Sequence, residues 1–147
     1  MSQDLKLTTF RPDRPGIRKV LGDLEAEVME FVWAKPAGEG TTVREVFAAL
    51  YEQRHLAYTS VMNTMTRLAK KNILRATKDG PAYVYYPTVT QEEFVSRFVS
   101  RVLSDLLVAF SEATVASIGA LTDPVAAQRA QELLAEIAKR RASEEDA

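Results

Sequence analysis

A stretch of the chain from Arg54 to Lys78 carries several basic side chains and not one acidic residue. The whole chain of 147 residues, in contrast, has 19 basic against 20 acidic residues and a formal net charge of -1. Bulk charge therefore cannot draw this protein to an anionic polymer, whereas a local basic patch can. We predict that this stretch binds an anionic partner through a defined face.

Small hydrogen-bonding residues occupy the centre of this stretch, where the apolar spacing predicts a helix from Tyr58 to Lys71. Thr, Ser and Asn are poorer helix formers than the Lys and Glu of most surface helices, by roughly a few tenths of a kcal/mol each. Their chemistry suits base edges in a DNA groove, because hydroxyls donate or accept, Asn pairs with adenine and Arg pairs with guanine. The candidate base-contacting residues are Tyr58, Thr59, Ser60, Asn63, Thr64 and Arg67.

Two of these residues have structural alternatives. Tyr58 is equally suited to packing at the junction between two helices, and Arg67 can pair with an acid of the first helix instead of DNA. Further basic residues follow around the expected helix end and hairpin, where contacts to phosphate would set register without specifying sequence. These candidate backbone contacts are Lys70, Lys71, Arg75 and Lys78, and a solvated face is the alternative.

The residue inventory argues against catalysis and metal chemistry. The chain has no Cys and a single His, His55, so it offers no thiolate site, no His-rich metal site and no thiol nucleophile. No nucleophile, base and orienting group form a recognisable set. We therefore expect no enzymatic activity, no cofactor and no bound metal. The apolar runs are shorter than a membrane span and the start lacks a signal-peptide core, so we expect a cytoplasmic protein without membrane insertion.

Hydrophobic periodicity predicts three helices and a β-hairpin between residues 21 and 88. The first helix begins near Leu21, and the second begins at Thr42, whose spacing from Glu45 has the capping-box form. The apolar residues expected to face inward from the third helix are Val61, Met62, Met65, Leu68 and Ala69. Segments rich in β-branched and aromatic residues on either side of Asp79-Gly80-Pro81 predict the hairpin. The expected fold is mainly α with a small β-wing, a winged helix-turn-helix domain followed by dimerisation helices.

The two ends of the chain have little apolar periodicity. Residues 1–20 contain Pro12 and Pro15 with a slight excess of basic residues, which predicts a flexible basic N-terminal arm. Such an arm can enter a minor groove, but we favour a solvated tail. Residues 142–147 are expected to form a frayed acidic tail.

Residues 89–141 predict helices with more apolar surface than they can bury among themselves. Thr90 and Glu93 have capping-box spacing, and the helix that follows to about Phe110 has a wide apolar stripe. We predict that a second copy covers this stripe in a two-fold homodimer, with a self-contained helical bundle as the alternative. The candidate interface residues are Phe94, Phe98, Val102, Leu103, Leu106, Leu107, Phe110, Leu133, Leu134 and Ile137.

Several segments carry a family resemblance in unbroken order over about residues 21–110. They include Leu56-Ala57-Tyr58-Thr59-Ser60-Val61-Met62-Asn63-Thr64, Arg67-Leu68-Ala69-Lys70-Lys71 and Ala82-Tyr83-Val84-Tyr85-Tyr86-Pro87. These segments resemble the penicillinase/methicillin-resistance repressor family, of the BlaI/MecI type. The resemblance implies a homodimeric winged-helix repressor that binds a palindromic operator and blocks promoters. In some members a membrane sensor-protease cuts the dimerisation region, so the resemblance also implies such a protease as a candidate partner.

The chain departs from the family pattern at two points that concern its release from DNA. The staphylococcal members are cut at an Asn-Phe bond, whereas this chain has no Asn after Asn72, so its release must differ or be absent. Related copper-responsive repressors carry a C-terminal cysteine cluster, and the lack of Cys excludes copper sensing through thiolates.

The sequence as a whole favours a transcriptional repressor that binds an inverted-repeat operator in double-stranded DNA as a homodimer. The alternative is a winged-helix protein-interaction module whose basic face binds an acidic partner.

Overall fold

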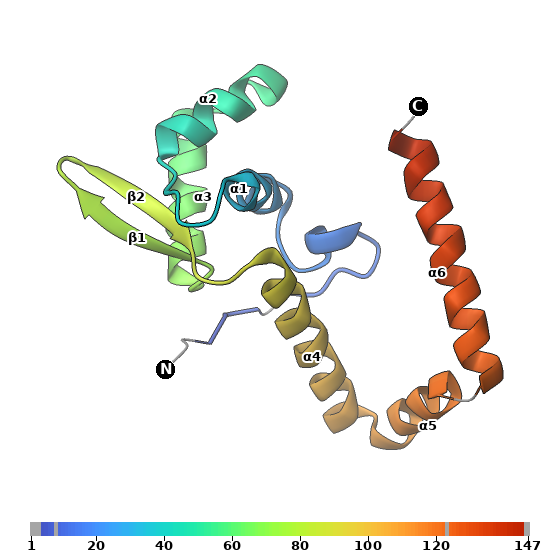
Figure 1. The fold of residues 1–147 in the computed structure, drawn as a ribbon. Helices are drawn as coiled ribbons and strands as arrows, with labels where there is room; N and C mark the ends of the chain where they lie inside the picture. Colours follow the sequence, from blue (N-terminus) through green and yellow to red (C-terminus); the bar gives the residue numbers. More distant parts are fainter. Residues whose placement is uncertain (1–3, 8, 123, 146–147) are drawn as a thin grey trace. The chain divides into compact units, whose positions relative to one another are not determined.

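The computed structural model describes residues 4–7, 9–122 and 124–145, and Figure 1 shows its course. The chain is mainly helical with one two-stranded antiparallel sheet, which confirms the predicted fold class. Its elements are a 3-10 helix η1 (Gly16–Lys19), α1 (Asp23–Ala34), α2 (Val43–Arg54), α3 (Tyr58–Lys70), β1 (Leu74–Asp79), β2 (Ala82–Pro87), α4 (Gln91–Ala109), α5 (Ser111–Thr122) and α6 (Pro124–Glu145). They form two compact units, Met1–Phe98 and Val99–Ala147.

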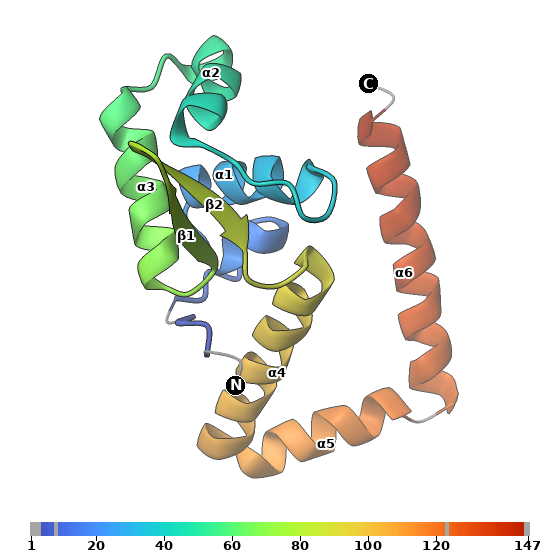
Figure 2. The same ribbon diagram turned by 60° about the vertical axis from the view of Figure 1, so that its left-hand side comes forward.

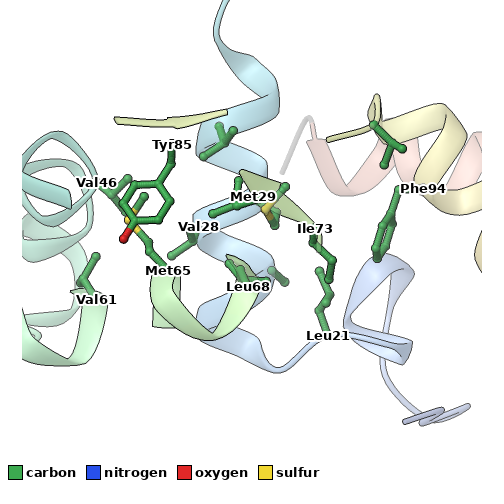
Figure 3. Close-up of a cluster of buried hydrophobic side chains, with 14 of the residues drawn as sticks. Leu21, Val28, Met29, Val46, Val61, Met65, Leu68, Ile73, Tyr85 and Phe94 are labelled. Atoms are coloured by element: carbon green, nitrogen blue, oxygen red, sulfur yellow. The ribbon is translucent and has the colours of Figure 1, made fainter. Parts of the chain in front are cut away.

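Apolar side chains from three helices and the base of the hairpin form the core of the first unit (Figure 3). The central residues are Leu21, Val28 and Met29 around α1, Val46 from α2, Val61, Met65 and Leu68 from α3, and Ile73, Tyr85 and Phe94. Burying a large aliphatic side chain stabilises a fold by about 1.5–3 kcal/mol, so these contacts hold α1, α2 and α3 together. The predicted inward face of α3 is therefore largely confirmed, with Met62 as an exception.

Helix α2 begins with the predicted capping box. The Thr42 side chain accepts a hydrogen bond from the Glu45 amide at 3.2 Å, and the Glu45 carboxylate accepts one from the Thr42 amide at 3.3 Å. Hydrogen bonding from Lys35, followed by that from the Thr42 backbone, holds the pKa of Glu45 below its ordinary value. Because two otherwise unpaired amides are satisfied, the turn before α2 has a fixed geometry.

Helix α3 ends in a Schellman motif. Asn72 adopts the left-handed conformation with φ 64°, and its amide donates to the Ala69 carbonyl at 3.0 Å. The Ile73 amide donates to the Leu68 carbonyl at 3.0 Å, and both of these side chains are fully buried. This hydrogen-bond pattern satisfies the last helical carbonyls and turns the chain directly into β1.

The hairpin is confirmed, and a third segment pairs with it. Strands β1 and β2 pair antiparallel from Leu74 opposite Pro87 to Asp79 opposite Ala82. Thr41, in the loop before α2, exchanges backbone hydrogen bonds of 2.9 and 2.8 Å with Tyr85. At Gly40 an added Cβ would lie 2.1 Å from a methyl carbon of Val84, so only glycine permits this approach. The hairpin is thereby anchored to the start of α2.

Part of the predicted flexible N-terminal arm is wrong, because residues 4–7 pack on the core of the first unit. Leu5 is only 8% exposed and belongs to the core. The Lys6 amide donates to the Lys71 carbonyl at 3.1 Å, and the Asn72 side-chain amide donates to the Asp4 carbonyl at 3.2 Å. We call residues 4–7 the N-terminal strap. It crosses the C-terminal end of α3, where apolar burial and backbone hydrogen bonds fix it.

Ion pairs connect two further residues of the predicted arm, Arg14 and Arg18, to α1. Arg14 pairs with Asp23, and Arg18 pairs with Asp23 at 3.3 Å and Glu27 at 3.4 Å. The hydrogen bond from Arg14 holds the pKa of the Asp23 carboxyl below its usual range. The basic residues that suggested a solvated arm are thus partly used to bind the acidic start of α1.

The second unit consists of the end of α4 together with α5 and α6, and α5 contacts α6. Helix α6 continues to Glu145, so most of the predicted acidic tail at residues 142–147 is helical. None of the helices, searched over the described residues, is long and apolar enough to cross a membrane.

We expect Leu5→Ala to lower the free energy of unfolding by about 2–3 kcal/mol, because it leaves a cavity under the strap. Urea denaturation of the full chain measures this loss. Lys6→Ala serves as the control, since the Lys6 side chain is exposed and its contact to Lys71 is made by backbone. Equal stability of wild type and Leu5→Ala would show that the strap does not pack in solution.

Candidate nucleic-acid interface

One face of α3 is built of exposed polar side chains. Figure 2 shows α3 along an outer side of the first unit, with the hairpin beside it. Its buried face holds Val61, Met65 and Leu68 against the core. The opposite face exposes Thr59, Ser60, Asn63, Thr66, Arg67 and Lys70. Because the buried face of α3 packs against the core, the helix has a fixed orientation, and its hydroxyl, amide and cationic groups have fixed positions on the surface.

Tyr58 packs at the junction between two helices, which is one of the two roles expected for it. Its ring lies 5.4 Å from that of Phe47 in an edge-on contact at the junction of α2 and α3. The residue is nevertheless exposed. The aromatic contact orients the side chain at the start of α3 without removing it from the surface.

Thr64 is a correction to the predicted base-contacting set. It is only 1% exposed, and its hydroxyl donates to the Ser60 carbonyl at 2.7 Å. A Thr hydroxyl that bonds to the carbonyl four residues earlier is satisfied within its own helix, so Thr can stand on a buried face. The Arg67 guanidinium donates to the Thr64 hydroxyl at 3.3 Å. Thr64 therefore lies behind the exposed face and contacts Arg67.

The basic residues divide into two groups according to their partners. Lys71 pairs with Glu25 of α1 at 2.8 Å, and Arg54 places one guanidinium nitrogen 2.7 Å from both carboxylate oxygens of Glu27. An ion pair with an acid of the first helix was the alternative considered for Arg67, but in the structure Lys71 and Arg54 form such pairs. Glu25 is largely buried, so Lys71 neutralises a carboxylate that is mostly shielded from water. Lys71 therefore has a structural partner in α1, and its contact to phosphate stays a prediction.

Four predicted contacts keep their charge available. Within the described part of the chain, no acid forms an ion pair with Arg67, Lys70, Arg75 or Lys78. All four residues are exposed. Arg67 and Lys70 belong to the polar face of α3, and Arg75 and Lys78 lie on β1.

Contacts within the hairpin orient the guanidinium group of Arg75. The Arg75 guanidinium lies 4.9 Å from the ring centre of Tyr86, its cross-strand partner, and donates to the Thr77 hydroxyl at 2.9 Å. Stacking over an aromatic face and a hydrogen bond restrict a flexible side chain without neutralising it. The Arg75 side chain is thus restrained while its charge stays without an ion-pair partner among the described residues.

Sequence reasoning missed two exposed residues of α3, Met62 and Thr66. Met62 was expected to face inward, but it is 40% exposed. Thr66 is also exposed, and its hydroxyl donates to the Met62 carbonyl at 2.9 Å. Met62, Thr66 and Lys70 form a row with a spacing of four residues, so all three share one side of the helix. The charged end of this row was the signal that could have placed Met62 outside.

A hollow of about 540 Å³ separates the start of α2, α3 and the tip of the hairpin. Its walls include Thr42, Arg44, Tyr58, Met62, Pro81 and Tyr83. Arg44 and Tyr83 were not among the predicted contacts, although both are exposed here. A groove with cationic, hydroxyl and apolar groups suits a polymer that carries both phosphates and flat bases.

The predicted dimer residues do not all lie on a free surface. Phe94 is a correction, because it is 0% exposed and its ring packs 5.3 Å from that of Trp33 within the first unit. Phe98 is half-buried against the same core, with its ring 5.7 Å from that of Phe10. Val102 is half-buried, whereas Leu103, Leu106, Leu107 and Phe110 are exposed. The side chains of Leu133, Leu134 and Ile137 lie outside the described residues.

No metal site accompanies these surfaces in the described part of the chain, where no three His, Cys, Asp or Glu residues gather closely enough to hold an ion.

The first unit is a winged-helix domain, because it consists of three helices followed by a β-hairpin. The outer face of its third helix is exposed to solvent. The chain belongs to the penicillinase repressor family, since the family model described as "Penicillinase repressor" matches residues 21–140. The family resemblance seen in the sequence is thereby confirmed.

Individual relatives match over shorter parts of the chain. Two proteins named "Transcriptional regulator BlaI", from the CDC 1551 / Oshkosh and H37Rv strains of Mycobacterium tuberculosis, are 45% identical over 76 residues. The match covers 52% of this chain and 54% of each relative, so the chain spans about half the length of these relatives.

Two solved structures are also similar to this chain, each at 27% identity over 48% of this chain and 83% of the other. One is the solution structure of the DNA-binding domain of the repressor BlaI, with a TM-score of 0.43. The other is the monomeric form of Bacillus licheniformis BlaI in complex with the blaP half-operator, with a TM-score of 0.40.

The division of the cations predicts different effects at two adjacent lysines. Lys71→Ala should lower the free energy of unfolding by about 1–3 kcal/mol, because it leaves the buried carboxylate of Glu25 without its partner. Lys70→Ala, which removes an exposed cation, should change stability by less than about 0.5 kcal/mol. Urea denaturation of both variants measures the difference. Two variants as stable as the wild type would mean that the Lys71–Glu25 pair has no structural role.

Proposed function

We propose that this chain is a cytoplasmic transcriptional repressor that binds an inverted-repeat operator as a homodimer and blocks access to the promoter. The observation that carries the proposal is the exposed face of α3, where hydrogen-bonding side chains accompany Arg67 and Lys70, two cations that form no ion pair within the described residues. Membership of the penicillinase repressor family and the names of the relatives support it.

In this proposal α3 lies in the major groove and its exposed side chains contact base edges. Asn63 offers an amide that pairs with adenine through two atoms, Arg67 offers a guanidinium that matches guanine, and Thr59 and Ser60 can contact any base. These assignments keep the predicted set except Thr64, which is buried. The first turns of the second helix of such a motif are the part that reaches base edges, which suits Thr59 to Arg67.

The phosphate contacts follow from the cations that remain unpaired. Lys70, Arg75 and Lys78 would bind phosphates beside the groove and fix the register of α3. Arg44 and Tyr83, on the hollow next to Tyr58, are further candidates. If the dimer neutralises roughly 6 phosphates, the logarithm of affinity should fall with the logarithm of salt concentration with a slope of about -5.

The homodimer is proposed from the exposed apolar residues at the end of α4. Leu103, Leu106 and Leu107 lie in about the last two turns of α4, Phe110 directly follows that helix, and all four residues are exposed. Isolated exposed apolar residues are common on monomers, but a contiguous apolar row marks a surface that another chain covers. A second copy with the same row would cover it symmetrically and place two α3 helices on one operator.

An acidic protein partner is the second candidate for the basic face. Its support is the basic stretch from Arg54 to Lys78, which contains no acidic residue and would attract an acidic protein surface as well as DNA. Filter binding with random and genomic DNA over a range of salt concentrations separates the two functions. Weak binding that is blind to sequence would favour the protein partner over the operator.

We expect Asn63→Ala to reduce the ratio of specific to non-specific DNA binding by about 5- to 100-fold, as expected for the loss of one bidentate base contact. Lys78→Ala should instead weaken both kinds of binding to a similar extent. Gel-shift titrations with an operator selected from genomic DNA and with random DNA measure both ratios. Footprinting without a protected inverted repeat at low salt would contradict the proposed function.

We also expect Leu106→Asp to produce monomers and lose operator binding, because a charge in an apolar interface lacks a partner. Light scattering after gel filtration gives the mass in solution. Ser104→Asp is the matched control, because it adds the same charge on another side of α4 and should remain dimeric. A dimer that persists in Leu106→Asp would place the interface elsewhere.

A further inference from the structure

An apolar side chain occupies the otherwise polar face of α3. Met62 is 40% exposed, whereas Val61, Met65 and Leu68, the apolar residues of this helix that face the core, are all 0% exposed. Keeping apolar surface in water is unfavourable, so an exposed Met on a candidate binding face suggests an apolar group on the partner.

The residues around Met62 indicate the chemistry of the partner that would carry this apolar group. Met62 lines the hollow between α3 and the hairpin tip together with Tyr58, Pro81, Ala82 and Tyr83. Arg44 also lines this hollow, and none of the lining residues is acidic. The occupant is therefore expected to be flat and apolar next to Met62 and anionic nearby, which fits nucleic acid better than an acidic peptide.

We propose that Met62 contacts the 5-methyl group of a thymine in each operator half-site and so helps to determine sequence specificity. This inference rests on the proposed function and adds one specific base contact to it. Thymine is the base whose major-groove edge carries a methyl group, and apolar side chains discriminate it by packing against that methyl. Asn63 follows Met62 directly, so the thymine should lie close to the base that Asn63 contacts.

The contact can be tested by removing the methyl group from DNA and the side chain from the protein. Each thymine of one operator half-site is replaced in turn by deoxyuridine, which lacks only the methyl, and affinities are measured by fluorescence anisotropy. Loss of one methyl-sized apolar contact should weaken binding about fourfold. We expect the wild type to show this loss at one position that Met62 faces.

Three variants assign the loss to Met62. Met62→Ala should bind the thymine operator about fourfold more weakly and should not respond to deoxyuridine at that position. Met62→Leu should retain the response. Lys70→Ala, which lies in the same exposed row, should weaken binding to every operator equally and keep the full response to deoxyuridine. Thermal melting checks that each variant is folded, which is expected because Met62 and Lys70 are both exposed.

The outcomes separate this inference from the function on which it rests. If the wild type binds the operator but is indifferent to every deoxyuridine, or if Met62→Ala keeps the full response, the thymine contact is wrong and the repressor function stands. If the wild type protects no inverted repeat at all, the proposed function fails and the thymine contact fails with it.

Discussion

The packing of α3 against α1 is the constraint on which the rest of the first unit depends. Val61, Met65 and Leu68 bury one side of α3, and the Lys71–Glu25 pair joins its end to α1. The Schellman turn at Asn72 and the N-terminal strap then hold the same end of the helix. Since the buried side is fixed at several points, the outer side is presented in one orientation, which is the condition for recognising a rigid surface such as a DNA groove.

Local sequence signals gave most of the fold because they act within a few residues. The capping box at Thr42, the Asp-Gly turn of the hairpin and the apolar periodicity of α1 to α4 each specify an element without help from distant residues. Contacts between distant residues were not visible. The strap depends on the packing of Leu5 in the core, and the bridge from Thr41 to Tyr85 has no periodic signal in the sequence. The contact between Trp33 and Phe94 joins two residues that are far apart in the sequence.

The candidate site was predictable as a face but not residue by residue. Thr59, Ser60, Asn63 and Arg67 are exposed as expected, whereas Thr64 is buried and Met62 is not. Both errors arise at the edge of an amphipathic helix, where a polar residue can satisfy itself within the helix and an apolar residue can be needed by a partner. The basic stretch also offers less positive charge to a partner than its composition suggests, because Arg54 and Lys71 neutralise acids of α1.

The claim that α3 enters a DNA groove can be tested directly because the chain has no cysteine. A single introduced cysteine can carry an iron chelate that cuts nearby DNA through hydroxyl radicals. A chelate on Thr66→Cys, on the exposed face of α3, should cut within each half-site of a bound operator. A chelate on Glu92→Cys, at the exposed start of α4, should leave those half-sites intact. Cutting of the half-sites from position 92 but not from position 66 would contradict binding through α3.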